Sequence, residues 1–268
     1  MSEGLTRQQR RKLERELLKL AGDLNRDGLP VPHRPEATMA LALAVREELS
    51  DTKTPGRASN AAALVERVFD LTMRKLPAAQ RQQPLACAAG CTYCCHNMVM
   101  ATAPEIFLAA SELRRNRDKA YLAEVGGRCD AVGQAREAGA RPPCPLLEND
   151  RCAVYAARPA VCRKHNSLAV AACRSEHEGK PSQIPLRRFD QGVFECCAAA
   201  LLTGLRLWDA RAASVFELSG ALKVVLQDER SEQKWLAGED VFAGVPSQAQ
   251  LPGIDDHVAM LMGRLAGG

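Results

Sequence analysis

The stretch CAAGCTYCCHN, residues 87–97, places four cysteines in nine positions. Three and two residues separate Cys87, Cys91 and Cys94, so one short loop can direct three thiols at one point. Metal sites use such loops because their sulfur ligands must converge to about 2.3 Å from a zinc ion. Side chains of adjacent residues diverge, so Cys95 is expected to face a different site or the core. The spacing predicts a metal or cluster site, with buried or redox-active thiols as the alternative.

A second group of cysteines follows in a segment rich in proline and turn-forming residues. This segment, residues 144–163, reads CPLLENDRCAVYAARPAVCR and holds Cys144, Cys152 and Cys162. Its composition predicts a second loop, and Cys95 is expected to belong with it. Seven thiols on two loops suit either one centre with spare thiols or two linked centres.

Thiolate ligands alone do not identify the metal. Zinc takes four thiolate or imidazole ligands, whereas an iron–sulfur cluster takes thiolates and can carry an electron or bind a substrate at an open iron. The spacing differs from the ferredoxin run C-x2-C-x2-C-x3-C-P, which disfavours a simple electron carrier. His96, His165 and His177 could replace a thiol, although each is more often a polar surface residue. The expected cofactor is zinc or an iron–sulfur cluster.

The composition favours metal ligation over disulfide bonds. The chain has 268 residues, 46% of them hydrophobic, and shows neither a signal-peptide pattern nor a membrane-spanning stretch. We expect a cytoplasmic protein, in which an odd count of 11 cysteines stays reduced. A net charge of +4 and an aromatic content of 4% give no sign of a nucleic-acid partner. The expected partner is a metal ion or cluster. A protein partner stays open, and no membrane partner is expected.

Helical periodicity accounts for most of the remaining chain. Helices are expected at residues 6–24, 36–49, 61–76, 102–115, 118–137, 193–208, 212–227 and 231–236. Thr6 with Gln9 has the pattern of a capping box, and Thr102 can cap the fourth helix. Residues 126–127, both glycine, are expected to interrupt the fifth helix, and a tail rich in proline and glycine should follow the last. Only a short strand or hairpin near the second loop is expected.

These patterns predict a mainly α fold, a helical domain with two cysteine-rich loops around a metal or iron–sulfur centre and little or no β structure. We expect an N-terminal helical region at residues 1–80, a cysteine-cluster metal-binding domain at 81–180 and a C-terminal helical region at 181–268, together forming one globular unit. Isolated Cys129 is expected to be a small buried side chain. The sequence does not decide whether Cys173, Cys196 or Cys197 is a ligand.

Both loops resemble the YkgJ family of cysteine-cluster proteins, which carries a CxxxCxxCC signature and is described as zinc- or iron-chelating. The stretch VMATAPEIFLAASEL, residues 99–113, is similar to the helix that follows the signature in that family. Its second block is matched by Cys144, Pro145, Leu147, Cys152, Tyr155, Arg158, Pro159, Cys162 and Arg163. The resemblance covers residues 87–173. It implies a metal site whose candidate ligands are Cys87, Cys91, Cys94, Cys95, Cys144, Cys152 and Cys162.

Two further resemblances concern catalysis. Relatives with this signature include the flagellin lysine N-methylases, which implies an alternative function as an iron–sulfur-dependent S-adenosylmethionine methyltransferase or redox enzyme. The CxxxCxxC spacing with Tyr93 before the last cysteine is also similar to the radical S-adenosylmethionine enzymes. That family needs a strand before the motif and a β/α repeat after it, and this sequence predicts neither.

Charged residues beside the cysteines have a clear physical task. An array of thiolates is anionic, so the guanidinium groups of Arg158 and Arg163, near Tyr155, are expected to offset its charge and donate hydrogen bonds to sulfur. Arg158 could instead pack its stem on the loop and keep its head in water. Three classes of function stay open: a metal-binding or metal-handling protein, a cluster-dependent enzyme, and an interaction protein whose fold is stabilised by a structural zinc ion.

Overall fold

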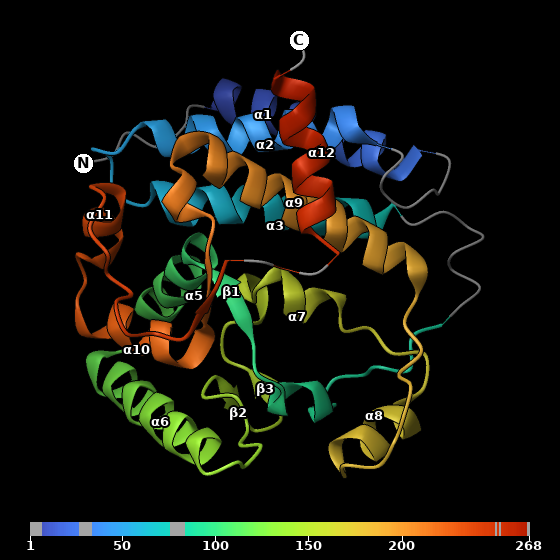
Figure 1. The fold of residues 1–268 in the computed structure, drawn as a ribbon, viewed down its shortest axis with the longest axis vertical. Coiled ribbons are helices and arrows are strands. Elements are labelled where there is room, and N and C mark those ends of the chain that lie inside the picture. Colours follow the sequence, from blue (N-terminus) through green and yellow to red (C-terminus); the bar gives the residue numbers. More distant parts are fainter. Residues whose placement is uncertain (1–6, 27–33, 76–83, 250, 252, 267–268) are drawn as a thin grey trace.

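The computed structural model describes residues 7–26, 34–75, 84–249, 251 and 253–266. Helices α2 (Pro35–Ser50) and α3 (Arg57–Arg74) pack on the long helix α9 (Arg188–Trp208), and α1 (Arg7–Asn25) packs on α3 and α2. Figure 1 shows these helices in the upper half of the molecule, with the cysteine-rich segments below them. The expected helices near 36–49 and 61–76 are confirmed with small shifts of their ends. The proposed Thr6 cap lies outside the described residues.

Helix α9 forms the centre of the core because most of its length is apolar and its small residues admit close neighbours. Gly204 lies so near α2 that a Cβ atom there would come within 2.6 Å of the Ala42 carbonyl oxygen and 2.5 Å of a Val45 methyl group. One large cluster of buried hydrophobic side chains contains residues from Leu17 in α1 to Leu261 near the C-terminus. All three sequence regions therefore contribute to it.

Helix α5 (Ala103–Asn116) begins where the sequence predicts. Thr102 and Glu105 form a capping box, in which the Thr102 hydroxyl accepts from the N3 backbone and the Glu105 carboxylate accepts from Thr102 N at 2.8 Å. This box satisfies backbone donors that the first helical turn leaves unpaired. Helix α5 then packs on α3 and on α10 (Leu218–Gln227), and thereby holds the chain that leaves the first cysteine loop.

Helix α6 (Lys119–Glu137) is continuous, so the predicted interruption at residues 126–127 is wrong. One face of α6 buries Val125, Cys129 and Val132, and the helix packs along α10. Two glycines in a helix cost about 2 kcal/mol relative to alanine, and burying this apolar face against α10 outweighs that cost.

The C-terminal part differs most from the prediction. The expected helix at 212–227 divides into a 3-10 turn (Ala210–Ala212), strand β4 (Val215–Glu217) and α10. Helix α11 (Ser231–Leu236) is confirmed. The expected tail instead contains strand β5 (Ser247–Gln248) and helix α12 (Asp255–Ala266), which Figure 1 shows crossing α9. Helix α12 buries Val258 and Leu261, and this packing stabilises it. From sequence alone, the glycines around this segment predict an irregular tail instead.

The β structure is short, and mainly α is the correct class. Strand β1 (Met100–Thr102) pairs antiparallel with β4 in a register that places Ala101 opposite Phe216, and β4 pairs with β5. This sheet was not expected, because strands of two or three residues show no alternation, and β1 and β4 lie more than a hundred residues apart in the sequence. The predicted hairpin near the second loop is present as β2 (Leu147–Glu148) and β3 (Arg151–Cys152).

No helix in the described ranges combines the length and the apolar character that crossing a bilayer requires.

Candidate metal centre

The first cysteine loop is fixed at its start by backbone pairing. Ala86 N donates to Ser167 O at 2.9 Å, and Ser167 N donates to Cys87 Sγ at 3.2 Å. Gly90 then takes a left-handed φ of 87°, which permits the tight turn into Cys91. The loop ends in a 3-10 turn, η2 (Tyr93–His96), which carries Cys94 and Cys95.

The second loop folds as the hairpin followed by a short helix. Asn149 and Asp150 have φ values of 46° and 59° at the turn, where their short polar side chains tolerate the left-handed region. Cys152 lies on β3, and Cys162 lies on α7 (Ala160–Lys164). Ala160 N donates to the buried carboxylate of Glu105 at 2.8 Å, so the α5 capping box also positions the helix that carries Cys162.

The structure brings the two loops together. Cys144 N donates a hydrogen bond of 2.7 Å to Cys95 O, which joins the end of the first loop to the start of the second. Burial is the main cause that raises the pKa of Cys162, and the charges of Cys144, Cys152 and Cys94 raise it further. The seven predicted ligands therefore lie on two loops that contact each other. Each of these cysteines is half-buried.

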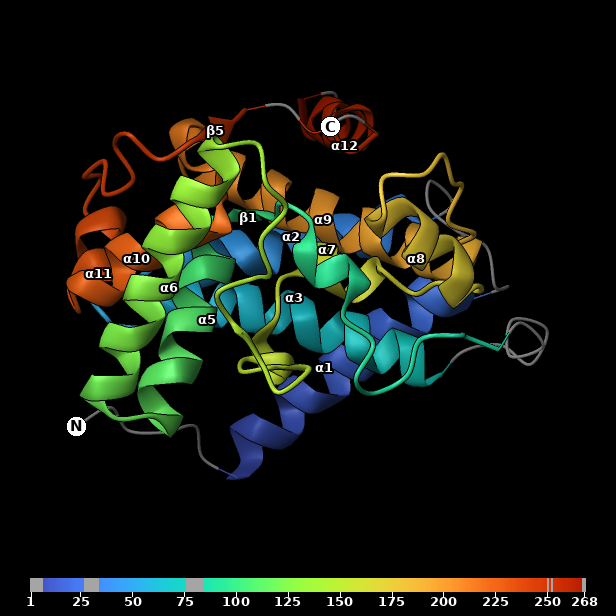
Figure 2. The ribbon, with the colours of Figure 1, turned by 90° about the horizontal axis from the view of Figure 1, so that it is seen from below.

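An eighth thiol joins them from helix α8 (Val170–His177). Helix α8 packs on η2, where Arg174 Nε donates to the Tyr93 hydroxyl at 3.0 Å. The charge of Cys173 is among the causes that raise the pKa of Cys87 and Cys91, after burial. In Figures 1 and 2, α8 lies at the edge of the molecule beside the short helical turn of the first loop. The sequence alone leaves the ligand role of Cys173 undecided, because its position depends on the packing of α8.

The thiols favour the protonated form in this structure. Burial raises the pKa of Cys144 to about 11. A hydrogen bond with the Cys95 thiol is the main cause that raises the pKa of Cys94, and burial adds to it. Metal ligation needs thiolates, so a bound metal must displace these protons.

The thiols do not converge on one point in this structure. Within the described residues, no three His, Cys, Asp or Glu side chains stand in an arrangement that could hold a metal ion. Closure of a site would therefore require these side chains or their loops to move.

Arg158 shows that the site suits an anionic group. Its Nε atom is buried, and no acceptor in the described part of the chain lies within hydrogen-bonding distance. Its charge lowers the pKa of Cys94, Cys152 and Cys162. Larger effects raise these pKa values: the contact with Cys95 in the case of Cys94, and burial in the case of Cys152 and Cys162. Arg158 also lies over the exposed Tyr155 ring, 4.1 Å from its centroid. A thiolate-bound metal or cluster would offer this unpaired donor a partner.

Arg163 has a different role from the expected one. Its guanidinium is 4% exposed and donates to Glu66 at 2.9 Å and to Asp70 at 2.7 Å, both on α3. Arg163 therefore fastens α7 to the N-terminal helices instead of donating to sulfur.

The remaining cysteines lie in the core. Cys129 is 3% exposed, as expected for a small apolar side chain. Cys196 and Cys197 are 2% and 0% exposed on α9, and the Thr38 hydroxyl donates to Cys196 Sγ at 3.3 Å. His165 is also partly buried, and burial lowers its pKa.

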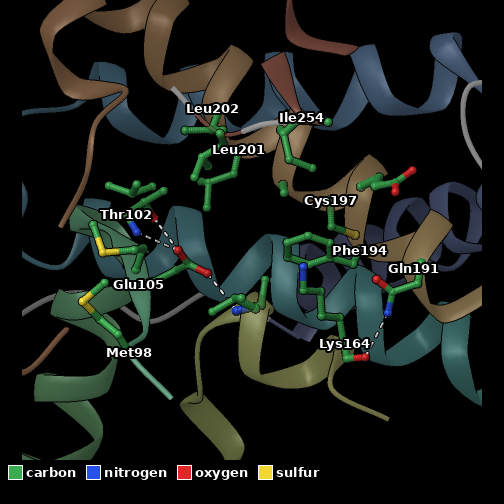
Figure 3. A pocket seen from close by; sticks show the side chains of 18 residues that line it. Met98, Thr102, Glu105, Lys164, Gln191, Phe194, Cys197, Leu201, Leu202 and Ile254 are labelled. Atoms are coloured by element: carbon green, nitrogen blue, oxygen red, sulfur yellow. Dashed lines mark hydrogen bonds between the residues drawn. The ribbon is translucent and has the colours of Figure 1, made fainter. Parts of the chain in front are cut away.

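A cavity of about 290 Å³ lies between β1, α7, α9 and the segment before α12. Figure 3 shows the apolar side chains of its wall, among them Met98, Phe194, Leu201, Leu202 and Ile254, beside the polar side chains of Thr102, Glu105, Lys164 and Gln191. Cys197 also lines it, and the Lys164 ammonium lies 4.4 Å from the centroid of the Phe194 ring. Val161 and Lys164, which flank Cys162 on α7, form part of the wall, so one short helix separates the cavity from the thiols.

Comparison with known proteins identifies the cysteine-rich segment. Residues 86–184, less than half of the chain, match the model of the CxxCxxCC family, which is described as a "putative zinc- or iron-chelating domain". The family name has two residues between the first two cysteines, where this chain has three, ending in the left-handed Gly90. No curated protein and no solved structure matches the chain.

Proposed function

Since residues 86–184 match the model of the CxxCxxCC family, we propose that the protein binds zinc or an iron–sulfur cluster through both cysteine loops. The candidate ligands are Cys87, Cys91, Cys94, Cys95, Cys144, Cys152 and Cys162. The observation that carries the proposal is the hydrogen bond from Cys144 N to Cys95 O, which places the two loops side by side.

The chemistry of the donors supports this function. Thiolates suit zinc and iron, and not the hard cations that prefer oxygen ligands. Each thiol is half-buried, so a metal could reach it from solvent and would then be partly shielded. The guanidinium of Arg158 adds a positive charge that acts on these thiols, and its Nε donor is unpaired.

The test is to measure zinc, iron and acid-labile sulfide per chain in protein purified without oxygen, together with its visible spectrum. We expect stoichiometric zinc, or iron and sulfide in equal amounts. Cys91→Ser should lose metal, whereas Cys129→Ser is the matched control, because Cys129 is buried on α6. Full metal content in Cys91→Ser would contradict the proposal.

A second candidate function is a cluster-dependent S-adenosylmethionine methyltransferase or redox enzyme, and the cavity beside α7 favours it. A largely apolar cavity with a few polar groups is typical of small-molecule sites, and this one shares α7 with Cys162. If the protein contains iron, adding S-adenosylmethionine should change the spectrum of the cluster. An unchanged spectrum, or zinc alone, would leave a metal-binding protein without this activity.

A further inference from the structure

The packing of α8 brings an eighth cysteine, Cys173, to the first loop. Cys173 and His177 are four residues apart, so they lie on one face of the helix. The His177 ring contacts Tyr93 and His96 of η2, with centroid distances of 5.7 and 4.5 Å. The face of α8 that carries Cys173 is therefore the face that packs on η2.

The backbone before α8 is held at the same corner. Ser167 holds the start of the first loop with two hydrogen bonds: its carbonyl oxygen accepts from Ala86 N, and its backbone N–H donates to Cys87 Sγ. Helix α8 begins at Val170, only three residues later. Two independent contacts, one at each end of the first loop, thus place Cys173 beside Cys87 and Cys91.

The vicinal pair marks a division between two sets of thiols. In a 3-10 turn, successive side chains point about 120° apart, so Cys94 and Cys95 cannot easily serve one tetrahedral site. Cys94 continues the spacing of Cys87 and Cys91, whereas the backbone of Cys95 bonds to Cys144.

We propose that the protein holds two metal centres, one on Cys87, Cys91, Cys94 and Cys173 and the other on Cys95, Cys144, Cys152 and Cys162. Each set has the four thiolates that a closed zinc site or a cubane cluster takes. This inference rests on the proposed function, and it adds both the ligand Cys173 and the number of centres. The charge of Arg158 acts on thiols of both sets.

His165 is the rival for the fourth position of the first set. Its backbone oxygen accepts from Cys87 Sγ at 3.8 Å, and its side chain is partly buried. A site with three thiolates and one imidazole would use His165 and leave Cys173 free. Substitution of the two residues separates these arrangements.

The experiment loads the full-length metal-free chain with Co²⁺, which reports thiolate ligation by charge-transfer absorption, and with Zn²⁺, counted after gel filtration. The wild type should bind two ions per chain. Cys173→Ser should bind one, Cys162→Ser should bind one, and the double variant none. His165→Gln should keep both, and Cys173→His should restore the ion lost in Cys173→Ser, because imidazole can replace a thiolate.

The outcomes distinguish the inference from the proposed function. One ion per wild-type chain, or two ions in Cys173→Ser, would overturn the two-centre inference while leaving a metal-binding protein. Loss of an ion in His165→Gln with none lost in Cys173→Ser would assign the position to His165. A wild type that binds neither ion would overturn the proposed function itself. Circular dichroism of each variant excludes loss of fold as the cause.

Discussion

Arg163 on α7 and Glu66 on α3 form an ion pair of 2.9 Å in which both side chains are buried, at 4% and 6% exposure. Asp70 gives the same guanidinium a second carboxylate at 2.7 Å. Burial raises the pKa of Glu66, and the charge and hydrogen bond of Arg163 oppose that rise. The helix that carries Cys162 is thus fastened to the N-terminal helices by charge as well as by apolar contacts.

Replacing Arg163 with methionine should destabilise the protein. The change leaves Glu66 buried without its partner, and breaking a buried pair in this way costs about 3–5 kcal/mol. Urea denaturation measures the free energy of unfolding. Arg211→Met is the matched control, since Arg211 pairs with Asp209 at the surface and is 78% exposed; it should cost less than about 1 kcal/mol. Equal effects of the two substitutions would show that the Arg163 pair is not structural.

Replacing Arg158 with methionine should weaken metal binding with little effect on the fold. The variant keeps an apolar stem but loses the unpaired donor and the positive charge beside the thiols. Loss of such outer contacts typically costs about 10–100-fold in metal affinity. Competition with a chromophoric chelator measures the affinity, and Arg151→Met, exposed in the same hairpin, is the control. Unchanged affinity in Arg158→Met would remove Arg158 from the site.

The close approach of α2 and α9 predicts opposite effects at two helical glycines. Gly204→Ala would place a Cβ atom 2.6 Å from the Ala42 carbonyl oxygen, so it should destabilise the fold by about 1–3 kcal/mol. Gly133→Ala on α6 meets no atom within 4 Å and should stabilise it by about 0.5–1 kcal/mol. Thermal unfolding of both variants gives the comparison. Similar shifts of Tm in one direction would contradict the close packing.

Several of these features depend on contacts that no local pattern encodes. The capping box of Thr102 and Glu105 could be predicted because its two residues lie three apart and act on one helix end. The pairing of Ala101 with Phe216 and the position of Cys173 depend on segments brought together only by folding. Arg163 was misassigned because sequence places it beside Cys162, whereas its partners lie on α3. Spacing therefore supplies seven candidate ligands, whereas the position of Cys173 requires the folded chain.

The stability of the metal-free protein should fall at alkaline pH. Burial raises the pKa of Cys144 to about 11 and that of Cys129 to about 12, whereas an unfolded thiol titrates near about 8.5. The neutral thiols therefore favour the folded state fully below about pH 8.5, and this contribution is lost as the pH rises through the folded-state values. Urea denaturation at several pH values should show a falling free energy of unfolding above about pH 8.5. In Cys129→Ala the decline should be shallower, and a constant stability up to about pH 10 would contradict the burial of these thiols.

The central claim is that thiolates from both loops hold the metal, and X-ray absorption at the metal edge tests it most directly. Protein purified without oxygen should show a first shell of sulfur only, at about 2.3 Å if the metal is zinc. Replacing Cys91 in the first loop, or Cys152 in the second, should each reduce the sulfur signal per chain. A first shell dominated by oxygen or nitrogen, or a sulfur shell unaffected by either substitution, would contradict the account.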